Sequence, residues 1–164
     1  MILGMSLAAF TQLHVVISLI GIVAGLVVAF GMFSSKRMPG WTVVFLVTTI
    51  LTSATGFLFP FTKLLPSHIV GIISLVVLAL ALLALYVYHA AGSWRWIYVT
   101  SALLALYFNV FVLVVQAFQK IPTLKQLAPN QTEPAFVVAQ GLVLVIVIAL
   151  IVGAVRAYHP PPSQ

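Results

Sequence analysis

Long apolar runs, separated by short polar turns, make up most of the sequence. Five of these runs are long enough to cross the hydrocarbon core of a bilayer as helices, which takes about 20 residues each. We expect these helices over residues 7–33, 41–61, 68–89, 94–118 and 134–158. The pattern predicts an all-α integral membrane protein, in which a bundle of five transmembrane helices forms a single domain over residues 1–164.

The turns between the apolar runs carry signals for helix ends. Pro60 and Pro66 stand on either side of the second turn, and Gly92 follows the third run. Ser67 and Ser93 stand directly before the third and fourth runs, where a serine hydroxyl can accept a hydrogen bond from a backbone N–H of the first helical turn. We therefore expect Ser67 and Ser93 to be N-caps.

The longest connection, residues 120–133, has its own pattern. Pro122 suits the start of a helix, and the surrounding segment has an apolar residue at every third position. These residues are Ile121, Leu124 and Leu127. The pattern predicts a short interfacial amphipathic helix over residues 121–128, in the loop before the last span.

Composition narrows the class of protein. Hydrophobic residues make up 63% of the chain and charged residues only 5%, whereas a soluble domain carries about 25% charged residues. The net charge of +6 would suggest nucleic acid in a soluble protein, but here the basic residues flank apolar runs as membrane anchors do. We expect membrane lipids as partners and no nucleic acid.

The chain is also poor in the residues of common catalytic sites. It has no cysteine, and Glu133 is its only acidic residue. Thiolate metal sites, paired-carboxylate catalysis and carboxylate-rich cation sites are therefore excluded. A hydrolytic enzyme is disfavoured too, because no acid within a span could orient a catalytic histidine.

Orientation follows from the residues at the ends of the spans. One side of the bundle has Lys36, Arg37, Arg95, Arg156 and all three tryptophans, while the other has Lys63, Lys120, Lys125 and Glu133. Basic residues are enriched on the cytoplasmic side. We expect the turn at residues 36–37 and the C-terminus in the cytoplasm, with the N-terminus outside.

Two helices have a face that should point into the protein. In the first span, His14, Ser18, Gly21 and Gly25 share one face, and the two glycines form a GxxxG pattern that allows close helix approach. In the fourth span, Asn109 and Gln116 lie two helical turns apart on one face. Since an amide facing lipid would leave hydrogen-bonding groups unmet, we expect the other helices to pack around this span.

These stripes predict a polar cavity in the outer half of the bundle. Its candidate ligand-binding residues are His14, Ser18, Thr52, Thr55, His68, Asn109, Gln116, Gln119, Lys120 and Gln140. We expect His14, Gln116 and Gln140 to converge, because the fourth and fifth spans follow one another and should be neighbours. The 121–128 helix would cover the cluster as a lid.

Several functions are compatible with this cluster. The cavity could bind a small ligand, a lipid head group or an ion, and Lys63 and Lys120 at its rim would favour an anion. A redox subunit that binds quinone or haem b is an alternative, with His14 and His68 as the metal-ligand candidates. At 1.5 Å per residue, the depths of His14 and His68 in the membrane differ by about 10 Å, which argues against one haem held between them. We predict no metal site.

The remaining alternatives are structural. The polar groups would then form inter-helix hydrogen bonds of roughly 0.6 kcal/mol each, and the threonine hydroxyls would bond to carbonyls of their own helix. The small residues of the fifth span, Ala149, Gly153 and Ala157, would pack on another protein. The chain would serve as a homo-oligomer or as a structural or assembly subunit of a larger membrane complex.

Four segments carry a resemblance to known proteins: TSATGFLFPF, PSHIVGIISL, LYFNVFVLVVQAFQKIP and the TEP before the last span. Through them, the second to fifth spans resemble a group of small polytopic proteins of bacterial inner membranes that have no assigned activity. The resemblance covers most of the chain. It implies a location in the cell inner membrane and supplies no mechanism.

Overall fold

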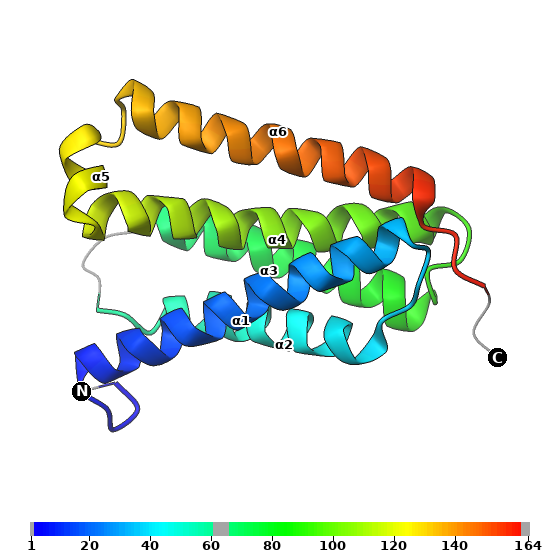
Figure 1. The fold of residues 1–164 in the computed structure, drawn as a ribbon. Helices are drawn as coiled ribbons and strands as arrows, with labels where there is room; N and C mark the ends of the chain where they lie inside the picture. Colours follow the sequence, from blue (N-terminus) through cyan, green and yellow to red (C-terminus); the bar gives the residue numbers. More distant parts are fainter. Residues whose placement is uncertain (1, 61–65, 162–164) are drawn as a thin grey trace.

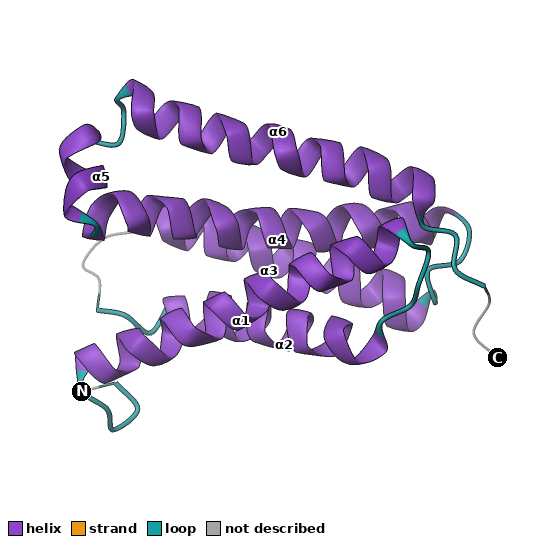
Figure 2. Ribbon diagram, viewed as in Figure 1, coloured by secondary structure: helices purple, strands orange, loops and turns teal. Residues whose placement is uncertain are grey.

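The computed structural model describes residues 2–60 and 66–161, without the side chain of Pro66. In this part of the chain the regular structure is entirely helical (Figures 1 and 2). The helices are α1 (Leu7–Phe33), α2 (Pro39–Gly56), α3 (Pro66–Leu82), α4 (Ser93–Lys120), α5 (Pro122–Leu127) and α6 (Pro134–Ala157), and a π-helical turn, η1 (Leu83–Val87), extends α3.

Five helical segments of the described chain are long and apolar enough to cross a membrane. They are α1, α2, the continuous segment Ser67–Val87, α4 and α6. The predicted all-α bundle of five transmembrane helices is therefore confirmed, and the chain is a multi-pass membrane protein. The short helix predicted in the last loop is also present, as α5.

Three helix ends differ from the sequence prediction. Helix α2 ends at Gly56 rather than near Phe61, because Pro60 disfavours a helical conformation in the residue before it. Ser67 is not an N-cap, since α3 already begins at Pro66, and proline is favoured in the first helical position. Ser93 is the first residue of α4, and Gly92 precedes it with a φ of 52° that glycine adopts easily.

Helix α4 is the centre of the bundle. It packs against α1, α2, α3 and α6, and Figure 1 shows it running between α6 and the other helices. Its buried residues extend from Tyr98 to Phe118 and include Asn109. The expectation that the other helices pack around the fourth span is confirmed, as is the contact between the fourth and fifth spans.

Helix α1 lies close to α2 and α4 at Gly21 and Gly25. A Cβ atom on Gly25 would lie 2.8 Å from Leu106 Cδ1 and from Phe45 Cε2. One turn earlier, a Cβ atom on Gly21 would lie 3.0 Å from Thr48 Oγ1. Because a side chain at either position would meet buried atoms of the neighbouring helices, the predicted inward face of the GxxxG pattern is confirmed.

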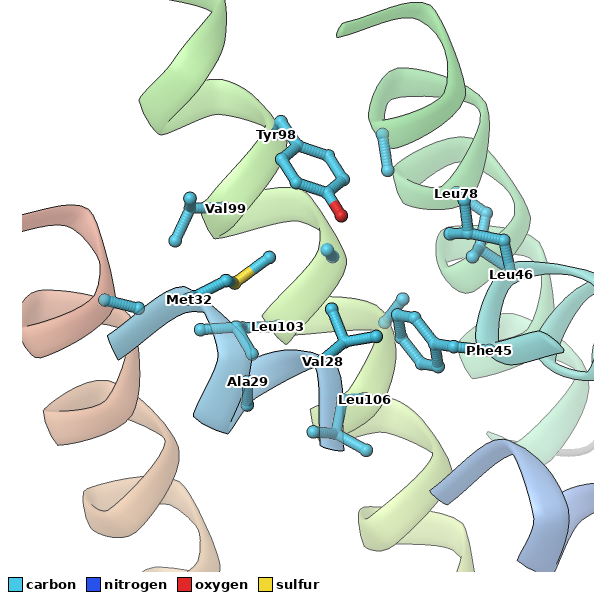
Figure 3. Close-up of a cluster of buried hydrophobic side chains, with 14 of the residues drawn as sticks. Val28, Ala29, Met32, Phe45, Leu46, Leu78, Tyr98, Val99, Leu103 and Leu106 are labelled. Carbon is cyan, nitrogen blue, oxygen red and sulfur yellow. The ribbon is translucent and has the colours of Figure 1, made fainter. Parts of the chain in front are cut away.

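The half of the bundle nearer the C-terminus is filled by apolar side chains (Figure 3). Four helices contribute the larger of them: Val28 and Met32 from α1, Phe45 and Leu46 from α2, Leu78 from α3, and Val99, Leu103 and Leu106 from α4. Phe45 and Leu106 lie at the glycine crossing, and the others lie between it and the end of the bundle where α6 ends. We call this part the packed half.

Helix α6 lies along α4 and α1. At Gly153 it meets the ring of Phe33, since a Cβ atom there would lie 2.5 Å from Phe33 Cε1, and Ala154 is fully buried. The small residues of the fifth span therefore do not form one exposed ladder: Gly153 packs within the chain, and Ala149 is exposed.

Candidate functional site: a polar cavity near the N-terminal end

The other half of the bundle contains a cavity of about 420 Å³ between α1, α2, α3 and α4. It lies beyond the glycine crossing, towards the N-terminus, where α1 presents His14 and Ser18 instead of glycines. Small residues face the cavity from the neighbouring helices, including Ser53 and Gly56 of α2 and Gly71 of α3. Helices that cross closely at one point separate away from it, and small side chains leave that space open.

Most of the predicted site residues line this cavity. They are His14, Ser18, Thr52, His68, Asn109, Gln116 and Lys120. Lys63, which was expected at the rim, lies outside the described residues. The cavity thus brings together polar side chains from four different helices, as the stripes on α1 and α4 predicted.

The position of His14 is fixed by two neighbours. Its Nδ1 lies 2.8 Å from Thr55 Oγ1, and Phe59 packs edge-on against the imidazole with ring centroids 5.2 Å apart. The Thr55 hydroxyl already donates its proton to the Leu51 carbonyl over 2.6 Å. With its proton given to Leu51, Thr55 accepts from His14, so we assign the imidazole proton to Nδ1 and a lone pair to Nε2.

The floor of the cavity is closed by hydrogen bonds between helices. Asn109 is buried and donates through Nδ2 to Thr49 Oγ1 over 3.3 Å. Ser53 donates to Ser74 over 3.3 Å, which joins α2 to α3. These contacts form a polar layer between the cavity and the packed half.

Two further polar side chains and one charged side chain face the cavity. Within the described residues, the side chains of Ser18 and Gln116 make no hydrogen bond, although both line the cavity. Lys120 lies at the end of α4 and brings a positive charge to the lining of the cavity. These groups could donate or accept hydrogen bonds with a molecule in the cavity.

His68 occupies a different environment from His14. It is buried near the start of α3 and stacks on Phe57, with ring centroids 5.7 Å apart. Within the described residues, no group of three His, Cys, Asp or Glu side chains is arranged to hold a metal ion. The polar side chains that line the cavity can take part in hydrogen bonds.

Three predicted site residues do not line the cavity. Thr55 acts through His14, as described above, and Gln119 is exposed. Gln140 of α6 donates through Nε2 to the Phe111 carbonyl over 3.1 Å. The expectation that Gln140 joins His14 and Gln116 is wrong, because α6 meets a face of α4 that does not line the cavity.

The expected lid is also absent from the described part of the structure. Helix α5 lies between the ends of α4 and α6 (Figure 1), and no residue of α5 lines the cavity. The sequence analysis also missed Ser74 and Thr49, which contribute to the floor. The signal for Ser74 was its spacing from Gly71, which is one helical turn away and places two small residues on one face of α3.

Comparison of the chain with protein-family models, with curated proteins and with solved structures gives no match in any of the three.

Proposed function

We propose that the protein binds a small amphiphilic molecule in the cavity near its N-terminal end. The observation that carries the proposal is the set of polar side chains that face the cavity from membrane-spanning helices without a partner among the described residues. Polar groups in an apolar environment are almost always hydrogen-bonded, and leaving one unmet costs on the order of 1–3 kcal/mol. A ligand with a polar head would meet these groups.

The charges of the cavity select the class of ligand. Lys120 is cationic, and Glu133, the only acidic residue of the sequence, belongs to the loop before α6 and does not line the cavity. A cationic ligand would thus find no carboxylate to neutralise it. The ligand that fits best is neutral or carries one negative charge.

The polar groups also define where the head of the ligand would lie. His14 presents a lone pair at Nε2, Gln116 offers both a donor and an acceptor, and Lys120 offers a charged donor. Apolar residues such as Leu19 and Val112 would surround the rest of the ligand. The volume of about 420 Å³ lies within the range of roughly 300–1,000 Å³ that is typical of small-molecule sites.

Thermal unfolding of the purified protein in phosphatidylcholine nanodiscs tests the proposal. The probes are decylubiquinone as a neutral amphiphile, laurate as an anion and dodecyltrimethylammonium as a cation. A bound probe at 100 times its Kd stabilises the protein by about 2.7 kcal/mol. We expect decylubiquinone or laurate to raise the unfolding temperature and the cation to have no such effect.

Two glutamines of α4 provide a matched pair of variants. Gln116→Leu removes an amide that lines the cavity, whereas Gln119→Leu removes an exposed amide nearby on the same helix. We expect about a five- to tenfold weaker binding for Gln116→Leu, because a lost hydrogen bond costs about 1 kcal/mol. Gln119→Leu should bind as the parent does.

Three results would contradict the proposal. Equal stabilisation by the cationic probe would refute the charge argument, and no stabilisation by any probe would favour inter-helix packing as the role of these residues. A Soret band in the absorption spectrum of the purified protein would select the haem alternative instead. The quinone alternative belongs to the neutral class, and the decylubiquinone arm tests it directly.

We further propose that the protein lies in a cell inner membrane with its N-terminus outside. The basic residues and tryptophans at the opposite end of the bundle support this orientation. Reporter fusions at residues 38 and 128 test it, with residue 38 expected in the cytoplasm and residue 128 outside. A cytoplasmic signal from residue 128 would invert the orientation and place the cavity on the cytoplasmic side.

A further inference from the structure

A second cavity, of about 340 Å³, lies at the end of the bundle that holds the C-terminus. The turn after α1, the turn before α4 and the C-terminal segment surround it. Its charged and titratable lining residues are Arg37, His89, Arg95 and His159. We call it the basic cavity, and it shares no lining residue with the cavity described above.

No acidic side chain balances these basic groups. Glu133 is the only acidic residue in the whole sequence, and it precedes α6 at the opposite end of that helix. Two guanidinium groups that share one small cavity repel each other unless an anion lies between them. The cavity therefore favours a negatively charged ligand.

The two arginines are held in place by backbone carbonyls of the C-terminal segment. Arg95 donates through Nη1 to the carbonyls of Val155 and Tyr158, over 2.7 and 2.8 Å. Arg37 donates through Nε to the Pro161 carbonyl over 3.3 Å. Within the described residues these bonds occupy one nitrogen of each guanidinium group, which leaves the others available to a ligand.

The backbone around the cavity is held equally firmly. The N–H of His159 donates to Ser35 Oγ over 2.7 Å and ties the C-terminal segment to the turn after α1. On the other side, His89 and Ala90 adopt φ values of 51° and 52°, which are unfavourable for residues with side chains. The Ala90 N–H donates to the Ala84 carbonyl over 2.8 Å and helps to hold this turn against η1.

We propose that the basic cavity binds a phosphate group. Guanidinium groups bind phosphate oxygens through paired, charge-assisted hydrogen bonds, and two of them converge here with two imidazoles. Inorganic phosphate and the head group of an anionic phospholipid present the same chemistry. This inference does not depend on the proposed function of the other cavity.

The test uses the full-length protein purified in detergent and has two arms. In the first arm, the unfolding temperature is measured with increasing inorganic phosphate, against sodium chloride of equal ionic strength. In the second arm, native mass spectrometry measures how much phosphatidylglycerol and phosphatidylcholine remain bound from an equimolar mixture. We expect stabilisation by phosphate or preferential retention of phosphatidylglycerol.

Arg37→Gln and Lys36→Gln form a matched pair of variants. Each removes one positive charge from the same turn and both side chains are exposed, but Lys36 does not line the cavity. We expect Arg37→Gln to weaken binding at least tenfold and Lys36→Gln to change it less than twofold. Because Arg37 also bonds to Pro161, His89→Gln serves as a second variant that removes a lining group and leaves that bond in place.

The two arms separate the sources of the phosphate group. If Arg37→Gln loses binding only of phosphatidylglycerol, the bound phosphate group belongs to a lipid head group. If it loses binding only of inorganic phosphate, the ligand is a free anion. Either result supports the basic cavity as the site. Equal losses in Arg37→Gln and Lys36→Gln would show general charge attraction and overturn the proposal, as would the absence of binding in both arms.

Discussion

Replacing Gly25 with alanine adds one methyl group at the point where α1 crosses α2 and α4. The new Cβ atom would lie 2.8 Å from Leu106 Cδ1 and from Phe45 Cε2, whereas carbon atoms prefer to be about 3.5–4.0 Å apart. Phe45 and Leu106 are almost completely buried, with 1% and 2% of their surface exposed. Relieving the overlap would require a shift of roughly 0.7 Å or more in a filled core.

The expected change in free energy has two parts. Overpacking of this kind costs about 1–3 kcal/mol. The alanine regains up to about 1 kcal/mol, because it is a better helix former than glycine. Gly141 of α6 isolates the second part, since a Cβ atom there would have no neighbour within 4 Å. Gly141→Ala should show only the gain.

Thermal unfolding in detergent, monitored by circular dichroism, measures the difference in stability between the two variants. We expect Gly25→Ala to be less stable than Gly141→Ala by about 1–3 kcal/mol, or several degrees at roughly 2–4 °C per kcal/mol. If the two variants were equally stable, or Gly25→Ala were the more stable, then α1 would not cross the other helices as closely as the structure shows, and the explanation of the cavity from this crossing would fail.

Three further predictions concern single side chains. Thr55→Val should weaken the preference of His14 for the proton on Nδ1, because it removes the acceptor 2.8 Å away; nitrogen-15 chemical shifts of the imidazole measure it, and a parent protein with the proton on Nε2 would refute the assignment. Arg95→Gln should destabilise the protein by about 1.5–3 kcal/mol, because the carbonyls of Val155 and Tyr158 lose their charged donor, whereas the exposed Arg156→Gln should not; equal unfolding temperatures would count against this role. Desolvation raises the pKa of Glu133, but hydrogen bonds, including those from Asn130 and Thr132, outweigh it and lower this pKa below its ordinary value of 4.5. The parent should therefore be more stable than Glu133→Gln above pH 4.5, and this advantage should disappear as the pH falls through the lowered pKa. A difference in unfolding temperature that did not change with pH would exclude the Glu133 carboxylate as its source.

The sequence was informative where a polar or small residue interrupts an apolar helix. Gly21 and Gly25 identified the inward face of α1, and Asn109 and Gln116 identified the cavity-facing side of α4. A group that is costly to expose to lipid fixes the rotation of its helix about the long axis. The same reasoning predicts the position of His14, which lines the cavity.

The sequence was less informative where a helix is apolar on every side. Helix α6 carries Gln140 as its only amide, and one amide can be satisfied in several ways. In the structure the Gln140 side-chain nitrogen donates to the Phe111 carbonyl, so Gln140 bonds to the backbone of α4 instead of joining His14 and Gln116. The threonines of α2 show why two interpretations could not be separated: Thr55 bonds to its own helix and to His14 at the same time.

The unequal filling of the two halves has a consequence for how the molecule moves. Opening a region exposes its buried apolar contacts, so regions with few such contacts open at lower free energy than the rest. The part of α1 before Gly21 borders the cavity, whereas the part after it packs against Phe45 and Leu106. We therefore expect backbone amides near the start of α1 to exchange hydrogen faster than those between Gly25 and Met32. Such local opening would let a molecule enter or leave one end while the other end remains folded.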